Sequence, residues 1–204
     1  MQDIKSKIKP IPSKLYAYQI FYEDLEKFKN FYSNISVTEF GCGGSKILDF
    51  IDPSFYQGID LNEEKILKSK NKYSNFNYNF HLGDMLNFRS NTKTDLGLCF
   101  QTLGINLSFD KDNLLKCLYN LNDHIKKDGS ILFNISNELY HKNKKNIDEF
   151  CTNNYEFNDY FFYGIFNKRY NHLLTRILVR IEHFISFRSF FKKFVYIKCS
   201  KKIN

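Results

Sequence analysis

The sequence predicts an α/β protein in which helices cover both faces of a mostly parallel sheet. Short apolar runs alternate with segments of helical periodicity along the chain, and this alternation is typical of parallel sheets. A glycine-rich turn, Gly41-Cys42-Gly43-Gly44, follows the first apolar run. A chain of 204 residues with 43% hydrophobic residues suits one domain, 1–204, with an ample core.

The individual elements follow from turn residues and periodicity. Strands are expected in apolar runs bounded by polar or glycine residues, and helices where apolar residues recur every three or four positions. After a first strand that ends before Gly41, the expected strands are 55–60, 76–82, 94–101, 130–135, 157–166 and 194–198. The expected helices are 45–52, 62–71, 110–127 and 142–152, with a helical lead-in or lid at 1–34 and a basic amphipathic helix at 168–193.

Two carboxylates accompany the glycine turn. Glu39 lies just before the glycines, where it would repel a pyrophosphate but suit the ammonium group of an amino-acid-like ligand. Asp60 ends the second expected strand, 19 residues after Gly41, at about the distance where Rossmann-like sheets place a ribose-binding acid. The pattern indicates a nucleotide-type cofactor with an amino-acid end.

This arrangement resembles the first motif of the class I S-adenosylmethionine-dependent methyltransferases, acid-x-Gly-x-Gly-x-Gly at the end of the first strand. Ser45 stands at the third glycine position, with Gly44 beside it. The resemblance implies a Rossmann-like, three-layer, doubly wound α/β fold with a seven-stranded, mostly parallel sheet and an antiparallel last strand. It also implies S-adenosylmethionine as the cofactor.

The resemblance also implies roles for residues after the later strands. Asp84 would bind the adenine amino group and Met85 would pack against the ring, while Phe100, Gln101 and Leu103 would line the methyl-transfer point. His141 is the best-placed general base, in an expected loop after the fifth strand; the alternative is an ordinary surface histidine. The full set of expected cofactor-binding residues is Glu39, Gly41, Cys42, Gly43, Asp60, Leu61, Asp84, Met85, Phe100 and Gln101.

Metal and disulfide chemistry are not expected. The five cysteines form no Cys-x-x-Cys pair and have no histidine cluster nearby, so they are expected to be reduced thiols. Asp110 and Asp112 lie together at one helix start, where capping explains them better than a metal does. With no apolar leader and no uncharged stretch of about 18 residues, a cytoplasmic protein is expected.

Positive charge is concentrated near the end of the chain. Residues 168–202 contain ten Lys or Arg and one acid, a sum of +9, whereas the whole chain carries +8. Three interpretations remain open: a helix packed on the sheet with solvated arginines, peripheral docking at an anionic membrane surface that would suit a lipid-linked acceptor, or nucleic-acid binding.

The predicted function is S-adenosylmethionine-dependent O-methylation of a sugar, a lipid-linked glycan or another small metabolite by in-line methyl transfer. The alternatives are an RNA methyltransferase that uses the basic segment, and a non-catalytic methyltransferase-like binding domain. A nicotinamide-dependent oxidoreductase is disfavoured, because its Gly-x-Gly-x-x-Gly fingerprint would need glycine where Lys46 stands. The sequence does not predict the oligomeric state.

Overall fold

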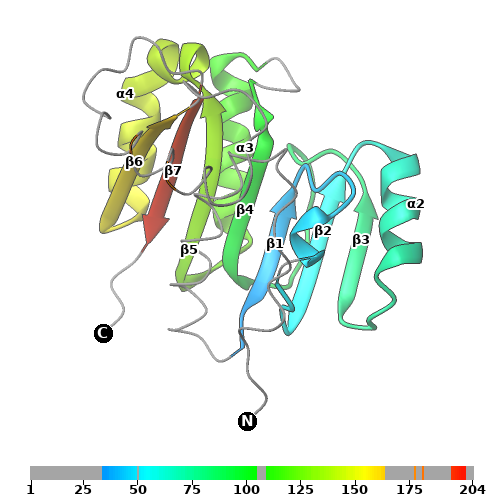
Figure 1. Ribbon diagram of the computed structural model, residues 1–204. Helices are drawn as coiled ribbons and strands as arrows, with labels where there is room; N and C mark the ends of the chain where they lie inside the picture. The colour runs from blue at the N-terminus through cyan, green and yellow to red at the C-terminus, as the bar shows by residue number, and fades with distance from the viewer. Residues whose placement is uncertain are drawn as a thin grey trace.

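The computed structural model describes residues 34–49, 51–104, 109–163 and 194–200, together with positions 177 and 181. In this part of the chain seven strands form one sheet in the order β3-β2-β1-β4-β5-β7-β6 (Figure 1). The strands are β1 Ser36–Phe40, β2 Phe55–Asp60, β3 Tyr78–Leu82, β4 Thr94–Leu103, β5 Ile125–Ser136, β6 Phe157–Tyr163 and β7 Phe194–Ser200.

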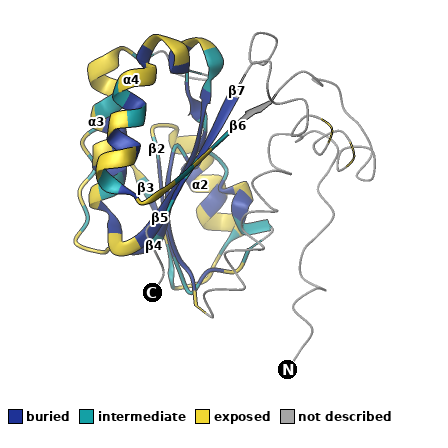
Figure 2. Cartoon of the chain, turned by 90° about the vertical axis from the view of Figure 1, so that its left-hand side faces the viewer, coloured by how far each residue is buried: buried dark blue, intermediate teal, exposed yellow. Residues whose placement is uncertain are grey.

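Helices lie on both sides of this sheet. They are the short 3-10 helix η2 Lys46–Asp49 and the α-helices α2 Glu63–Lys72, α3 Lys111–Asp123 and α4 Asn137–Asn154. Figure 2 shows α3 and α4 on one face of the sheet and α2 on the other. The predicted three-layer arrangement is therefore confirmed. No helix among the described residues has both the length and the apolar character that crossing a membrane requires.

The strand directions also match the prediction. β1 pairs in parallel with β2 and β4, β2 with β3, and β4 with β5, whereas β7 runs antiparallel between β5 and β6. All five residues of β1 are buried, as expected of a central strand covered on both faces. The main apolar cluster lies between the sheet and helices α3 and α4, where Phe40, Phe133 and Phe150 are fully buried.

The predicted end of the helix at 110–127 is wrong. Helix α3 ends at Asp123, and the segment 125–129 is already the first part of β5. Buried His124 terminates the helix: its Nε2 accepts the N–H of Ser90 at 3.1 Å, so the other ring nitrogen, Nδ1, donates to the carbonyl of Asn120 at 2.7 Å. The lysines and glycine that suggested a helix end thus belong to a strand.

Other boundaries differ by a few residues. Helix α4 begins at Asn137 instead of 142, because Ser136 caps it by accepting the Leu139 N–H at 3.3 Å. Asp110 caps α3 as predicted, accepting the Asn113 N–H at 2.7 Å. The predictions for 1–34 and 168–193 fall outside the described residues, apart from Asn34 and two helical positions, Ile177 and Ile181.

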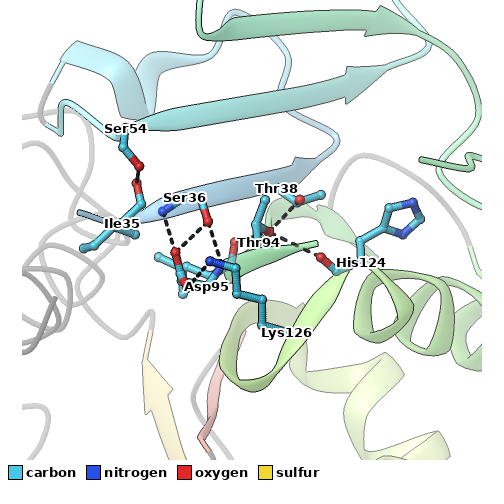
Figure 3. Close-up of polar contacts among 9 residues, drawn as sticks. Ile35, Ser36, Thr38, Ser54, Thr94, Asp95, His124 and Lys126 are labelled. Carbon is cyan, nitrogen blue, oxygen red and sulfur yellow. Dashed lines mark hydrogen bonds and ion pairs between the residues drawn. The ribbon is translucent and has the colours of Figure 1, made fainter. Parts of the chain in front are cut away.

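A polar cluster joins three strands at their amino ends (Figure 3). The Asp95 carboxylate on β4 accepts the backbone N–H of Ser36 on β1 at 2.9 Å, the Ser36 hydroxyl at 2.6 Å and the Lys126 ammonium on β5 at 2.8 Å. Burial opposes ionisation of this carboxyl, but the bonds from Lys126 and Ser36 outweigh it and lower its pKa. The cluster fixes the relative position of β1, β4 and β5.

Candidate functional site

A cavity of about 610 Å³ lies at the carboxyl ends of β1, β2 and β4, on the edge of the sheet where doubly wound proteins bind ligands. Its wall contains nine of the ten residues predicted to bind the cofactor: Glu39, Gly41, Cys42, Gly43, Asp60, Leu61, Met85, Phe100 and Gln101. The structure thus brings these residues together, while their roles in binding stay predictions.

The glycine turn has the geometry that only glycine adopts easily. Gly41 and Gly43 have φ values of +70° and +53°. A Cβ added at Gly41 would lie 2.3 Å from the Thr102 hydroxyl oxygen, so β1 and β4 approach closely here. Gly44, in contrast, has no atom within 4 Å of an added Cβ. Ser45, at the third glycine position of the motif, is also left-handed, with a φ of +48°.

Asp60 is held in a fixed orientation at the end of β2. One carboxylate oxygen accepts the Gly43 N–H at 2.7 Å, and the other accepts the Asn62 N–H at 2.8 Å. Each carboxylate oxygen keeps further acceptor capacity, because an ionised carboxyl offers about four lone-pair directions. These remaining acceptor positions suit the two hydroxyls of a ribose, the role predicted for Asp60.

Glu39 is a buried carboxyl on the cavity wall. Its side chain is 7% exposed, and it accepts a short hydrogen bond from the hydroxyl of buried Tyr56 on β2. Desolvation raises the pKa of Glu39 to about 8, although the bond from Tyr56 acts in the opposite direction. Ionising this buried group is therefore costly, and a cation placed beside it would stabilise the charge. An ammonium group is such a cation.

One wall of the cavity comes from the end of β4. Phe100, Gln101 and Thr102 line it, whereas Leu103, also predicted to be there, is fully buried in the core cluster next to α3 and α4. The prediction for Leu103 is thus wrong, and Thr102 takes its place. The resemblance implied Leu103 from its place at the end of the strand. This segment leaves the regular ladder with β5 between Cys99 and Leu103, so that Thr102 lines the cavity and Leu103 enters the core.

Two other predicted residues lie elsewhere. Asp84 is not on the cavity wall; its carboxylate accepts the Leu86 N–H at 2.9 Å and the Asn87 side-chain amide at 2.8 Å, so it shapes the turn that carries Met85. His141 is not in a loop but within α4, and it is absent from this cavity's wall. Its predicted role as general base has no support from its position.

Several residues near the cavity are not among those predicted from the sequence. Asn62 and Lys65 come from the start of α2, and Lys46 follows the glycine turn. Their positions could have been inferred, because the first turns of helices that follow β1 and β2 lie at the carboxyl edge of the sheet. Tyr56 could not have been found in this way, since it reaches Glu39 through the pairing of β1 with β2.

These observations fit S-adenosylmethionine as the bound group. The volume lies within the range of small-ligand pockets, about 300–1,000 Å³. A carboxyl such as Glu39 suits an ammonium group, a carboxyl such as Asp60 suits ribose hydroxyls, and the backbone of the glycine turn lines the cavity beside them.

Comparisons with known proteins show the family and the fold of the chain. A family model described as a methyltransferase domain matches residues 32–178. The search of curated proteins gave no match. Among solved structures, the N-methyltransferase NodS from Bradyrhizobium japonicum WM9, in complex with S-adenosyl-L-homocysteine, is 10% identical with a TM-score of 0.63 over 99% of this chain and 98% of its own.

Two further structures share the fold. The plantazolicin methyltransferase BpumL is 16% identical, with a TM-score of 0.56 over 98% of this chain and 88% of its own. A SAM-dependent methyltransferase from Archaeoglobus fulgidus is 12% identical, with a TM-score of 0.56 over 90% and 94%. At these identities the structures show the fold alone, whereas the family model covers most of the chain. The chain therefore belongs to the methyltransferase domain family, as an S-adenosylmethionine-dependent enzyme of the class I, Rossmann-like type.

Proposed function

We propose that this methyltransferase O-methylates a small acceptor, a sugar or a related metabolite, free or linked to a lipid. The observation that carries the proposal is the cavity, whose wall combines the carboxyls of Glu39 and Asp60 with a left-handed glycine turn and a neutral segment at the end of β4. Each part of this cavity has a role in the proposal.

Glu39 would hold the ammonium group of the cofactor, and Asp60 the ribose hydroxyls. Leu61 and Met85 supply apolar surface for the adenine ring, beside the backbone of Gly83. Asp84 acts on this part only indirectly, through the turn that it stabilises. The bound cofactor supplies a methyl group on a sulfonium, which is electrophilic without further activation.

The chain's own contribution is to orient the acceptor and to exclude water, since in-line displacement needs no covalent enzyme intermediate. Phe100 and Gln101 line the cavity at the end of β4, the strand that pairs with β1 beside the glycine turn. An aromatic ring and a carboxamide are groups that can contact the apolar face and the hydroxyls of a sugar. This pair supports a small polar acceptor.

Two considerations decide how the acceptor is sought. NodS is named as an N-methyltransferase and BpumL as a plantazolicin methyltransferase, so amines must be tested beside hydroxyls. The basic segment 168–202 would suit an acceptor at an anionic membrane, and both of its described helical residues, Ile177 and Ile181, are more than 40% exposed.

The test is a methyl-transfer assay with purified protein, S-adenosylmethionine and matched panels of sugars, amino sugars and small amines, with and without anionic liposomes. Formation of S-adenosylhomocysteine together with a methylated sugar hydroxyl supports the proposal. Methylation confined to amines would replace O- with N-methylation, and methylation of RNA alone would contradict the small-molecule assignment. Asp60→Asn should abolish turnover, and Asp112→Asn, in the first turn of α3, is the matched control.

A further inference from the structure

The pairing of β4 with β5 is interrupted where β4 reaches the cavity. Cys99 pairs with Phe133 and Leu103 pairs with Ile135, so three residues of β4 lie opposite one residue of β5, Asn134. The three residues, 100–102, are those that line the cavity. A bulge of this kind bends the strand and redirects its side chains.

The central residue of the bulge is strained. Gln101 has a φ of +57°, in the left-handed region that residues with a Cβ rarely adopt. Such a conformation persists only where the surroundings hold it, and it occurs preferentially at functional sites. Some contact must therefore compensate for its cost at the end of β4.

Asn134 makes that contact. Its side chain is fully buried, and its Oδ1 accepts the backbone N–H of Gln101 at 2.7 Å. In a regular ladder, backbone carbonyls of the neighbouring strand accept such N–H groups; within the bulge, this side-chain oxygen supplies the acceptor. Asparagine is otherwise unfavourable inside a buried strand, since its amide must be satisfied there.

A second contact, from β7, supports the same bulge. Tyr196 on β7 pairs with Asn134 across the sheet, and its ring packs against the ring of Phe100 with the centroids 5.8 Å apart. The residue before Gln101 is thus held by an aromatic contact, and Gln101 itself by the Asn134 side chain.

We propose that Asn134 is a positioning residue: its side chain holds the left-handed bulge at Gln101 and thereby shapes the wall of the cofactor cavity at the end where the methyl group is transferred. The inference rests on the proposed function for its effect on cofactor binding. The bulge and the hydrogen bond from the Gln101 N–H to Asn134, in contrast, do not depend on a bound ligand.

The first test is calorimetric titration of Asn134→Leu with S-adenosylhomocysteine. The variant has nearly the same size but no acceptor, so we expect binding about tenfold weaker than in the wild type. Asn134→Ser, which is too short to reach Gln101, should show the same loss and gives a second variant if the first folds poorly. Asn143→Leu is the matched control, because buried Asn143 bonds the Leu139 carbonyl within α4; it should lower the melting temperature and leave affinity unchanged.

A mutant cycle separates positioning from a merely structural effect. Glycine adopts a positive φ without strain, so in the Gln101→Gly background Asn134→Leu should weaken binding by less than about twofold. Equal losses in both backgrounds, or an unchanged affinity in Asn134→Leu, would overturn the proposal.

Amide hydrogen exchange in the ligand-free protein tests the hydrogen bond between Gln101 and Asn134 independently of cofactor binding. Asn134→Leu should accelerate exchange of the Gln101 amide and leave Leu96 and Leu98, earlier in β4, unchanged. If the exchange rate of the Gln101 amide is unchanged in Asn134→Leu, the proposal that Asn134 holds the bulge is wrong, even if the wild type binds S-adenosylhomocysteine. If the wild type binds no S-adenosylhomocysteine, the proposed function fails, and the Gln101 rate still decides whether Asn134 holds the bulge.

Discussion

Glu39 shows how a single buried side chain couples stability to ligand binding. Its pKa is about 8 in the folded protein, against 4.5 for the unperturbed group, mainly because of desolvation. Between these two values the unfolded chain has lost the proton that the folded protein still holds. The free energy of unfolding therefore falls as the pH rises through this window, by at most about 1.4 kcal/mol per pH unit.

The prediction for Glu39 is that Glu39→Gln removes this slope. Glutamine cannot ionise, so the variant should be more stable than the wild type at the upper end of the window, and its affinity for S-adenosylmethionine should fall. Urea unfolding at several pH values between 4.5 and 8 measures the slope. Parallel slopes for the two proteins would show that Glu39 ionises normally.

Gly41 gives a second prediction at this scale. Gly41→Ala combines a positive φ with a Cβ placed 2.3 Å from the Thr102 hydroxyl oxygen. We therefore expect the free energy of unfolding to fall by about 2–4 kcal/mol, and cofactor binding to become too weak to measure. Gly44→Ala is the matched control, because its added Cβ meets no atom within 4 Å. Similar effects of the two substitutions would contradict the close approach of β1 and β4.

At the scale of elements, the cluster around Asp95 should set acid stability. The lowered pKa of Asp95 means that its contribution is present above its ordinary value of 3.8 and is lost as the pH falls through the folded value. Asp95→Asn weakens the links between β1, β4 and β5, so it should reduce the free energy of unfolding at neutral pH by about 2 kcal/mol.

Between neutral and acidic pH, the free energy of unfolding should fall less in Asp95→Asn than in the wild type. Thermal unfolding from neutral to acidic pH tests this, with Asp112→Asn as the control for an aspartate in the first turn of a helix. If Asp95→Asn behaves like the control at neutral pH, the cluster in Figure 3 contributes little to stability.

For the whole molecule, sequence patterns were sufficient for the fold class, the order of elements and the location of most of the cavity. Buried parallel strands are continuous apolar runs, and turn residues bound them, so β2 was predicted with its observed ends. The patterns failed where tertiary contacts override local signals. Lys126 and Gly129 resemble a helix end, but Lys126 bonds Asp95 and an added Cβ at Gly129 would lie 2.7 Å from the Asp95 carbonyl oxygen.

The site was predicted incompletely for a related reason. Leu103 was misplaced because the bulge in β4 shifts its register, and His141 because Ser136 starts α4 earlier than the periodicity indicates. Tyr56 and Asn134 act across strand pairs, and pairing partners are not readable from one segment alone. Contacts between neighbouring strands are thus the part of the site that only the three-dimensional structure reveals.

The most direct test of the account is calorimetric titration of the wild type with S-adenosylmethionine and, in parallel, with NAD, repeated for Asp60→Asn and Asp112→Asn. We expect a dissociation constant in the micromolar range for S-adenosylmethionine and no heat with NAD. Asp60→Asn should bind at least about tenfold more weakly, and Asp112→Asn should bind like the wild type. Absence of S-adenosylmethionine binding, binding of NAD in its place, or full affinity in Asp60→Asn would contradict the cofactor site described for this cavity.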